Sequence, residues 1–336
     1  MNIKTSSLKE FQKLAGTIKS NGILSIHDYL KFEHGKITKT VGHAFIQFDC
    51  EGITENLLVE EKQLFNLVNG TLSDNIIITK KGKKVTLSDA RDNLTFQVPD
   101  EAFPIIPEIE GSITELSEEF TKYLKMASYF PLRTETIPSL KSFIMIGNNS
   151  ICASDGFIAF YGKVKESFTA VIDKETAGAI SGMNITGFAQ TTNYQFFFSN
   201  GVIMGFSTHE MGYTDMRKFF VNRSKKPDFV ASSSDLSSFN SLALKSVPKD
   251  CSCVMAKGKI KMDNSSYDIQ LERPLEYVQM EDEFLYNPEQ MNRLLSAIKS
   301  DEIEFTNGGK MYYIKSSEGD FDTLIMKLTK AVTTTN

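Results

Sequence analysis

Residues 287–314 read NPEQMNRLLSAIKSDEIEFTNGGKMYYI, a stretch that combines the signals of a helix with those of a β-hairpin. Asn287 can cap a helix, and Pro288 suits the first helical position. The apolar residues that follow recur at the spacing of one helix face: Met291, Leu294, Leu295 and Ile298. Asn307-Gly308 then separates two apolar runs, and Asn-Gly commonly joins hairpin strands because both residues tolerate positive φ. The stretch therefore predicts one amphipathic helix followed by two antiparallel strands.

The same helix-and-hairpin pattern starts near Glu60 and Asp173, so its three copies lie 113 and 114 residues apart. A second series of amphipathic helices, one before each copy, starts near Ser7, Ser117 and Asp235. Solenoid units repeat every ~20 to 50 residues, whereas a period of this length is typical of a small domain. We therefore predict an α+β protein with three similar domains in line, each with two helices on one face of its β-sheets. The predicted domains span residues 1–111, 112–225 and 226–336.

Local signals define the predicted boundaries of several elements. Ser7-Leu8-Lys9-Glu10 predicts a capping box, in which Ser7 and Glu10 satisfy free amide groups of the first helix. Ser117, which precedes two glutamates, predicts the start of the corresponding helix in the second copy. Segments 104–112 and 222–233 are predicted linkers between copies because of their proline or serine content.

The composition fits a soluble cytoplasmic protein. The chain is 41% hydrophobic and 24% charged, and no apolar run is long enough to span a bilayer. Residues 1–11 contain no signal-peptide core. Four scattered cysteines are too few for a disulfide framework, and Cys251-Ser252-Cys253 lacks further ligands at zinc-site spacing. We expect the cysteines to be reduced and mostly buried.

The sequence contains little that could support catalysis. Its four histidines are not paired at metal-ligand spacing, and neither a phosphate-binding glycine loop nor a nucleophile elbow is present. Asp155-Gly156 follows an apolar strand and is typical of a turn rather than of a catalytic acid. We therefore expect a non-enzymatic protein with no catalytic residues, no metal and no cofactor.

The polar faces of the predicted helices repeatedly carry basic residues. Any one of these helices, taken alone, has an ordinary solvated face. Helices at equivalent positions in three domains would, however, line one common surface, and a basic common surface suggests contacts to phosphates. The formal net charge of −5 argues against retention on nucleic acid by bulk electrostatics but leaves room for a segregated basic surface. The basic residues that could make such phosphate contacts, on these helices and their flanks, are Lys9, Lys13, Lys19, Lys122, Lys125, Lys174 and Arg293.

Four short strings occur in a fixed order along the chain: DEAFP at 100–104, ASDG at 153–156, YTDM at 213–216 and LIMKL at 324–328. Together with the threefold repeat, their order and spacing resemble the bacterial sliding clamp, the β subunit of DNA polymerase III, over essentially the whole chain. That family usually reads Ala-Thr-Asp-Gly, Phe-Pro-Asp-Tyr and Met-Pro-Met at the last three places. Here Phe157-Ile158-Ala159 replaces the family's His-Arg-Leu, and Lys327 replaces its C-terminal proline.

The resemblance implies that two chains close head to tail into a ring of six domains, with twelve helices around a central hole. In such a ring, sequence-independent contacts to phosphates permit sliding along double-stranded DNA. Arg133 and the region of Lys19 match DNA-contact positions of the family. The implied dimer contacts, for which packing within a domain is the alternative, are Phe65, Leu67, Leu242 and Leu244.

The resemblance also implies an apolar pocket for short partner peptides between the second and third domains. Its residues would be Leu140, Ser154, Gly156, Phe157, Ala159, Phe219, Asn287, Leu324, Ile325 and Met326. Core packing is the alternative for each of them, and the replacements at Phe157 and Ile158 predict a less polar pocket than usual. The implied function is a processivity factor that is loaded by a separate ATP-driven loader and tethers the replicative polymerase and other DNA enzymes. The competing prediction is a three-domain scaffold protein that kept the fold without encircling DNA.

Overall fold

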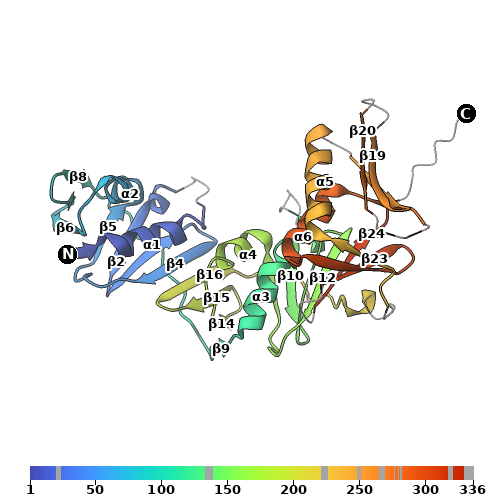
Figure 1. Cartoon of the computed structure of the whole chain (residues 1–336). Helices are drawn as coiled ribbons and strands as arrows, with labels where there is room; N and C mark the ends of the chain where they lie inside the picture. The colour runs from blue at the N-terminus through green and yellow to red at the C-terminus, as the bar shows by residue number, and fades with distance from the viewer. Residues whose placement is uncertain are drawn as a thin grey trace, which may run out of the picture. The chain divides into compact units, whose positions relative to one another are not determined.

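A computed structural model describes residues 1–19, 24–132, 139–220, 226–247, 251–264, 269–275, 277–278, 280, 282–316 and 321–328. Within these ranges the chain forms six α-helices and 24 β-strands (Figure 1), which confirms the predicted α+β class. No helix in these ranges is long and apolar enough to cross a membrane.

One order of elements occurs three times: a strand, a helix, four strands, a second helix and three strands. The first run comprises β1 (Asn2–Lys4), α1 (Thr5–Ala15), β2 (Tyr29–Glu33), β3 (Lys36–Thr40), β4 (Ala44–Asp49), β5 (Leu57–Glu60), α2 (Glu61–Gly70), β6 (Asn75–Lys81), β7 (Lys84–Ser88) and β8 (Asn93–Gln97). The second comprises β9 (Thr114–Glu115), α3 (Glu118–Ala127), β10 (Phe143–Gly147), β11 (Ser150–Ser154), β12 (Ile158–Lys163), β13 (Ala170–Asp173), α4 (Lys174–Ile180), β14 (Gly187–Gln190), β15 (Tyr194–Ser199) and β16 (Val202–Ser207). The third comprises β17 (Phe229–Ser232), α5 (Ser233–Ser246), β18 (Cys253–Ala256), β19 (Lys259–Asn264), β20 (Ile269–Pro274), β21 (Phe284–Tyr286), α6 (Pro288–Ile298), β22 (Glu302–Asn307), β23 (Met311–Ser316) and β24 (Phe321–Met326).

The strands form four antiparallel sheets that mix the runs in a regular way. Two sheets have eight strands, in the orders β5-β2-β3-β4-β16-β15-β14-β9 and β13-β10-β11-β12-β24-β23-β22-β17. Two have four strands, in the orders β1-β6-β7-β8 and β20-β19-β18-β21. Each eight-stranded sheet therefore joins four strands of one run to four strands of the next.

The chain forms two compact units. Unit 1 contains Met1–Leu116 and Gly178–His209, and unit 2 contains Ser117–Ala177 and Glu210–Asn336. Each unit holds one eight-stranded and one four-stranded sheet. The division into three domains at residues 1–111, 112–225 and 226–336 stays a prediction.

In each unit a helix covers one face of the eight-stranded sheet. In unit 1, Phe11 of α1 packs against Phe48 of β4, with ring centroids 5.8 Å apart. In unit 2, Tyr123 of α3 packs against Phe160 of β12 and Phe321 of β24, at 6.0 and 6.1 Å. Glycine makes room for this contact, since a Cβ at Gly162 would lie 2.7 Å from the Tyr123 ring.

The predicted helix starts at Ser117 and Asn287 are correct, and each of these residues caps its helix. The Ser117 hydroxyl accepts a hydrogen bond from Phe120 N, and the Asn287 side chain accepts from Glu289 N and Gln290 N. The capping box at Ser7 is wrong, because α1 already starts at Thr5 without a side-chain cap. Thr5 N instead donates to Asp74 O at 2.8 Å, so the β1–β6 pairing sets this start. Likewise α5 starts two residues before Asp235, where Ser232 caps it.

All three predicted hairpins are present. They are β6–β7, β15–β16 and β22–β23, and their turns contain Gly82, Gly201 and Gly309 at positive φ. The predicted linker at 222–233 is wrong in its second half, since Phe229–Ser232 forms β17 and pairs with β22.

The four cysteines are free and buried, which confirms that prediction. Burial raises the pKa of the Cys50 thiol to about 11 and also raises the pKa of Cys152.

Candidate functional site

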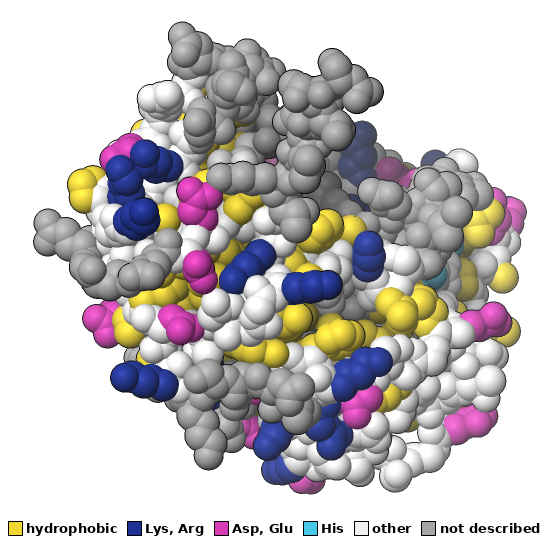
Figure 2. Space-filling view, turned by 90° about the vertical axis from the view of Figure 1, so that its right-hand side faces the viewer, with side chains coloured by type: hydrophobic (Ala, Val, Ile, Leu, Met, Phe, Trp, Pro, Cys, Tyr) yellow, Lys and Arg dark blue, Asp and Glu magenta, His cyan; other side chains and the backbone are white. Residues whose placement is uncertain are grey.

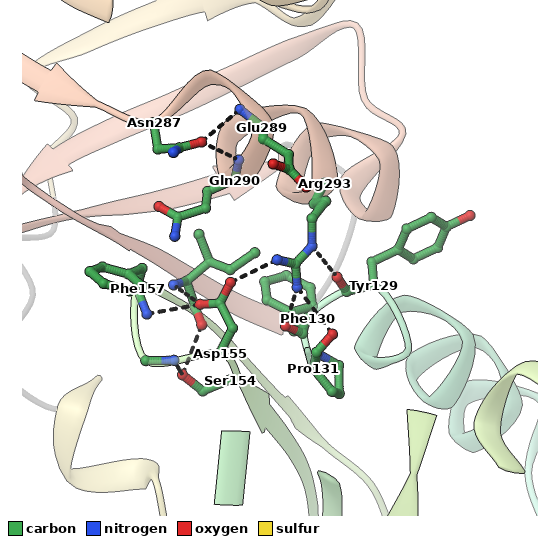
Figure 3. Close-up of polar contacts among 12 residues, drawn as sticks. Tyr129, Phe130, Pro131, Ser154, Asp155, Phe157, Asn287, Glu289, Gln290 and Arg293 are labelled. Carbon is green, nitrogen blue, oxygen red and sulfur yellow. Dashed lines mark hydrogen bonds and ion pairs between the residues drawn. The ribbon is translucent and has the colours of Figure 1, made fainter. Parts of the chain in front are cut away.

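The Ser154–Phe157 segment of unit 2 forms a tight turn between β11 and β12 (Figure 3). The Asp155 carboxylate is 1% exposed, and its Oδ1 atom accepts hydrogen bonds from Phe157 N and Ile158 N, both at 2.8 Å. Gly156 N donates to Ser154 Oγ at 2.9 Å, and Gly156 has φ +92°, a conformation that favours glycine. As a result the turn projects the Phe157 ring, which is 45% exposed, towards solvent.

Arg293 of α6 holds this turn from the helix side (Figure 3). Its Nη1 forms an ion pair with Asp155 Oδ2 at 2.8 Å, and its Nε donates to Tyr129 O at 3.0 Å. Its Nη2 donates to Phe130 O and to Pro131 O. The predicted DNA-binding side chain is thus occupied by contacts inside unit 2, and we leave Arg293 out of the proposed DNA surface.

The strand pairing beside the turn brings several of the predicted pocket residues together. Ala159 of β12 is opposite Leu324 of β24, and Met326 N donates to Phe157 O at 2.7 Å. Ala159 and Leu324 belong to a buried cluster on the sheet face that α3 does not cover. Ile325 alternates to the opposite face, the one that carries Phe321 and α3, and is fully buried. We therefore omit Ile325 from the proposed pocket.

Residues 211–220 cover part of this second face. Met216 and Phe220 are buried in the cluster, whereas Tyr213 packs against it and bonds to the Ser150 hydroxyl at 3.1 Å. The 3₁₀ helix Arg217–Phe219 follows, and Tyr313 Oη donates to Phe219 O at 2.9 Å. This anchoring leaves the Phe219 ring 45% exposed, with Lys218 Nζ 5.4 Å from its centroid.

A further exposed apolar residue and a lysine lie next to the turn. Leu140 opens a short 3₁₀ helix, Leu140–Ser142, and is 43% exposed. Lys141 is also exposed, and its Nζ lies 3.2 Å from the position that a Cβ of Gly156 would occupy. Sequence reasoning missed Lys141, although it directly follows the predicted Leu140. Figure 2 shows one face of the molecule on which apolar side chains lie beside lysines and arginines.

The predicted Asn287 has a structural role as the cap of α6, which occupies its side-chain oxygen. Gln290, one turn further, points towards the Asp155 turn (Figure 3). Its Oε1 is buried and has no hydrogen-bond partner among the residues that the structure describes. An unsatisfied buried carbonyl of this kind could accept a hydrogen bond from a bound ligand.

The predicted DNA-binding lysines fall into two groups. Exposed lysines lie on α1, α3 and the segment after α1: Lys9, Lys13, Lys19, Lys122 and Lys125. Lys9 and Lys13 share one face of α1, opposite its buried Leu8 and Phe11. Lys174 is half-buried, and its Nζ donates to Pro131 O at 2.8 Å. Arg133 lies outside the described residues.

The predicted dimer residues are all at least partly accessible in the chain. Leu242 of α5 is 45% exposed, and Leu244 is half-buried. Phe65 and Leu67 of α2 are half-buried, and Phe65 lines a surface pocket of about 380 Å³ together with Asp28, Glu60, Glu61 and Lys62. A role of these residues in dimerisation stays a prediction.

Within the described ranges no group of three or more His, Cys, Asp or Glu residues could hold a metal ion. This part of unit 2 carries exposed apolar side chains, the ammonium groups of Lys141 and Lys218, and the buried Gln290 Oε1 that has no partner among the described residues. Such a surface suits binding of a short peptide.

No family model matches the sequence, and no curated protein matches it. The fold, however, is that of bacterial sliding clamps, the β subunits of DNA polymerase III, along the whole chain. The Pseudomonas aeruginosa subunit superposes with a TM-score of 0.80 at 12% identity, over 98% of this chain and 100% of that one. The Streptococcus pyogenes subunit gives 0.79 at 16% identity, over 98% and 99%. The Helicobacter pylori clamp bound to a DNA ligase peptide gives 0.78 at 13%, over 98% and 100%.

Proposed function

We propose that this protein is a DNA sliding clamp: a non-catalytic, homodimeric ring in the cytoplasm that encircles duplex DNA and tethers a polymerase and other DNA enzymes. The observation that carries the proposal is the pairing of strands between successive runs of elements. The same pairing joins the first run to the second and the second to the third, and, among the residues that the structure describes, it leaves one strand at each end of the series with an unpaired edge. The resemblance of the fold to the β subunits supports it.

This pairing rule is visible where one run of elements meets the next. The third strand of the first four-strand group, β4 or β12, pairs with the last strand of the following run, β16 or β24. The equivalent strands at the chain ends are β20 of the third run and β8 of the first. In the described part of the chain each of these pairs on one side only.

Applying the rule once more pairs β20 of one copy with β8 of another copy. This contact is head to tail, and head-to-tail contacts form either a closed ring or an open filament. Closure after two copies would give the six-domain ring implied by the clamp fold. The apolar side chains of β8 that would be covered are Leu94 and Phe96, which are half-buried in the single chain. They extend the predicted dimer set of Phe65, Leu67, Leu242 and Leu244.

The exposed lysines of α1 and α3 are the proposed DNA contacts: Lys9, Lys13, Lys19, Lys122 and Lys125. A ring holds DNA by topology, so a few salt-dependent phosphate contacts are sufficient, and the net charge of −5 is tolerable. The proposed contact from Lys174 is secondary, because Lys174 Nζ donates a hydrogen bond to Pro131 O. Arg133 is a proposed contact that rests on the family resemblance alone.

The proposed peptide pocket is the surface made by Leu140, Phe157, Phe219 and Met326, with Ala159 and Leu324 beneath. Exposed rings and aliphatic chains suit a partner peptide with large apolar anchors. The Lys141 ammonium would favour a peptide carboxylate beside those anchors. The Gln290 Oε1 atom could accept a hydrogen bond from a peptide N–H group. The H. pylori clamp, which binds a DNA ligase peptide, supports such a use of this fold.

The test uses circular and linear DNA and needs no loader. Dimers are dissociated by dilution, allowed to reassociate in the presence of plasmid, and separated from free protein by gel filtration. We expect protein to remain with the circles at high salt and to be released once a restriction enzyme cuts them. Equal retention on both forms would instead favour a scaffold protein that kept the fold without encircling DNA.

A further inference from the structure

A buried ion pair in unit 2 connects the α6 helix to the turn that carries Phe157. The Asp155 carboxylate uses Oδ1 for the two backbone amides of the turn and Oδ2 for the Arg293 guanidinium (Figure 3). The Asp155 side chain is 1% exposed and that of Arg293 is 21% exposed. The orientation of the turn therefore depends on where Arg293 holds this carboxylate.

Arg293 is itself fixed by the chain that leaves α3. Three successive carbonyls, of Tyr129, Phe130 and Pro131, accept hydrogen bonds from its Nε and Nη2 atoms. Together with Asp155 these contacts account for four of the five N–H donors that a guanidinium possesses. A side chain so fully engaged has a single defined position and little capacity left for a phosphate.

We propose that Arg293 is a positioning residue of the partner pocket: by fixing the Asp155 carboxylate against the end of α3, it holds Phe157 in the orientation that a partner peptide contacts. This inference rests on the proposed function, because it deepens the assignment of the same pocket. Arg293 does not touch the peptide and acts through Asp155.

The consequence of removing the guanidinium follows from the burial of Asp155. A buried carboxylate without its partner is strongly disfavoured, so the turn would rearrange to expose it to water. The rearrangement would release the amides of Phe157 and Ile158 from Oδ1, while Met326 N would still hold Phe157 O. Phe157 would then sample several orientations, and a peptide would have to order it on binding.

The experiment compares Arg293→Gln, Arg293→Lys, Asp155→Asn and the double variant in the full-length chain. The probe is the fluorescein-labelled DNA ligase peptide of the type bound to the H. pylori clamp. We expect Arg293→Gln to weaken its binding about tenfold and Arg293→Lys less, since an ammonium cannot replace a fork of donors. The double variant should bind no worse than the weaker single variant, because both changes remove one interaction. Amide exchange of residues 155–158 should accelerate about tenfold in parallel with the loss of affinity.

Lys39→Gln is the matched control, because it also removes a buried cation. Lys39 in unit 1 is 6% exposed and donates to Glu61 Oε1 and to Ala15 O. This variant should lower the stability of the protein without changing peptide affinity. An equal loss of affinity in Lys39→Gln, or unchanged affinity in Arg293→Gln, would overturn the positioning role.

Failure of the inference and failure of the proposed function are separable. Arg293→Gln should be retained on circular DNA as wild type is, since its role concerns the pocket alone. A wild-type protein that binds the peptide but is not retained on circles would contradict the ring and leave the positioning role supported. A wild-type protein that does not bind the peptide would contradict the pocket and the positioning role together.

Discussion

Strand edges in this chain exist in two states, paired at the β4–β16 and β12–β24 junctions and open at β8 and β20. The equivalent strands differ accordingly in burial. In β16, Met204 is fully buried and Phe206 is 5% exposed, whereas Leu94 and Phe96 of the equivalent β8 are half-buried. The comparison shows how much burial a strand gains from a neighbour, and in the described part of the chain β8 and β20 lack that neighbour.

The open edges also differ from each other in charge. β8 reads NLTFQ and has no charged side chain, whereas Glu272 of β20 forms ion pairs with Lys259 and Lys261 of β19. Charges on an edge strand discourage pairing with unrelated strands. The charged side chains of β20 would therefore discourage its pairing with unrelated strands, while the neutral β8 places no like charge opposite them in the head-to-tail contact of the proposed ring.

The largest effect is expected at a paired junction, from the change Gly205→Ala in β16. Gly205 is opposite Phe45 of β4, and a Cβ at this position would lie 2.0 Å from the Phe45 ring. Because the ring is buried and has little room to move, we expect a loss of about 3 kcal/mol in the free energy of unfolding. Urea denaturation measures it.

Gly178→Ala in α4 is the control for that change. A Cβ there would meet no heavy atom within 4 Å, and the residue is helical, so alanine should leave stability unchanged or raise it by about 0.5 kcal/mol. Equal effects of the two variants would mean that the junction tolerates repacking and is not a tightly closed edge.

An intermediate effect is expected at the open edge, from Leu94→Lys in β8. If β8 pairs with β20 of a second copy, a buried ammonium at this position should weaken the dimer about 100-fold, as measured by sedimentation equilibrium. Ile77→Lys is the matched control, since Ile77 is 48% exposed on β6 of the same sheet, two strands away from the edge. Dimers weakened equally by both variants would place the contact elsewhere on unit 1.

The sequence predicts structural features that depend on neighbouring residues and does not predict those that depend on distant ones. Helix starts that depend on neighbouring residues, at Ser117 and Asn287, were predictable from the chain itself. The start of α1 was not, because Thr5 bonds to Asp74 O and Ser73 O, nearly 70 residues away in sequence. Strand order is likewise non-local, so no local pattern could have predicted that β4 pairs with β16.

The residues of the candidate site likewise fall into those that the sequence could predict and those whose contacts depend on distant parts of the chain. Order and spacing of short strings sufficed to predict the clamp fold and to select Leu140, Phe157 and Phe219, which are exposed. Arg293 appeared on a polar helix face, but its partner Asp155 lies 138 residues earlier, so its burial in an ion pair could not be foreseen. The sequence also placed Ile325 beside Leu324 in the pocket, whereas alternation along β24 directs the buried Ile325 side chain to the opposite face of the sheet.

The smallest effect is expected from charge reversal on α1. This change tests where α1 lies in a dimer in which β8 of one copy pairs with β20 of the other. Lys9→Glu with Lys13→Glu should leave folding and dimerisation intact, because both side chains are exposed. Each phosphate contact contributes about 0.9 to the slope of log affinity against log salt, so two lysines in each of two chains account for a change of up to about 3.6. The measurement is DNA affinity over a series of salt concentrations.

Lys80→Glu with Lys81→Glu is the matched control, since it changes the charge of unit 1 by the same amount on the β6–β7 hairpin. Bulk electrostatics would make the two double variants equivalent, because the net charge changes equally in both. A ring with α1 towards its hole requires that only the α1 variant lower the slope. If the protein dimerises through β8 and β20 but the α1 variant keeps the wild-type slope of log affinity against log salt, the helices of the closed assembly face away from DNA. That result would favour the scaffold protein over the clamp.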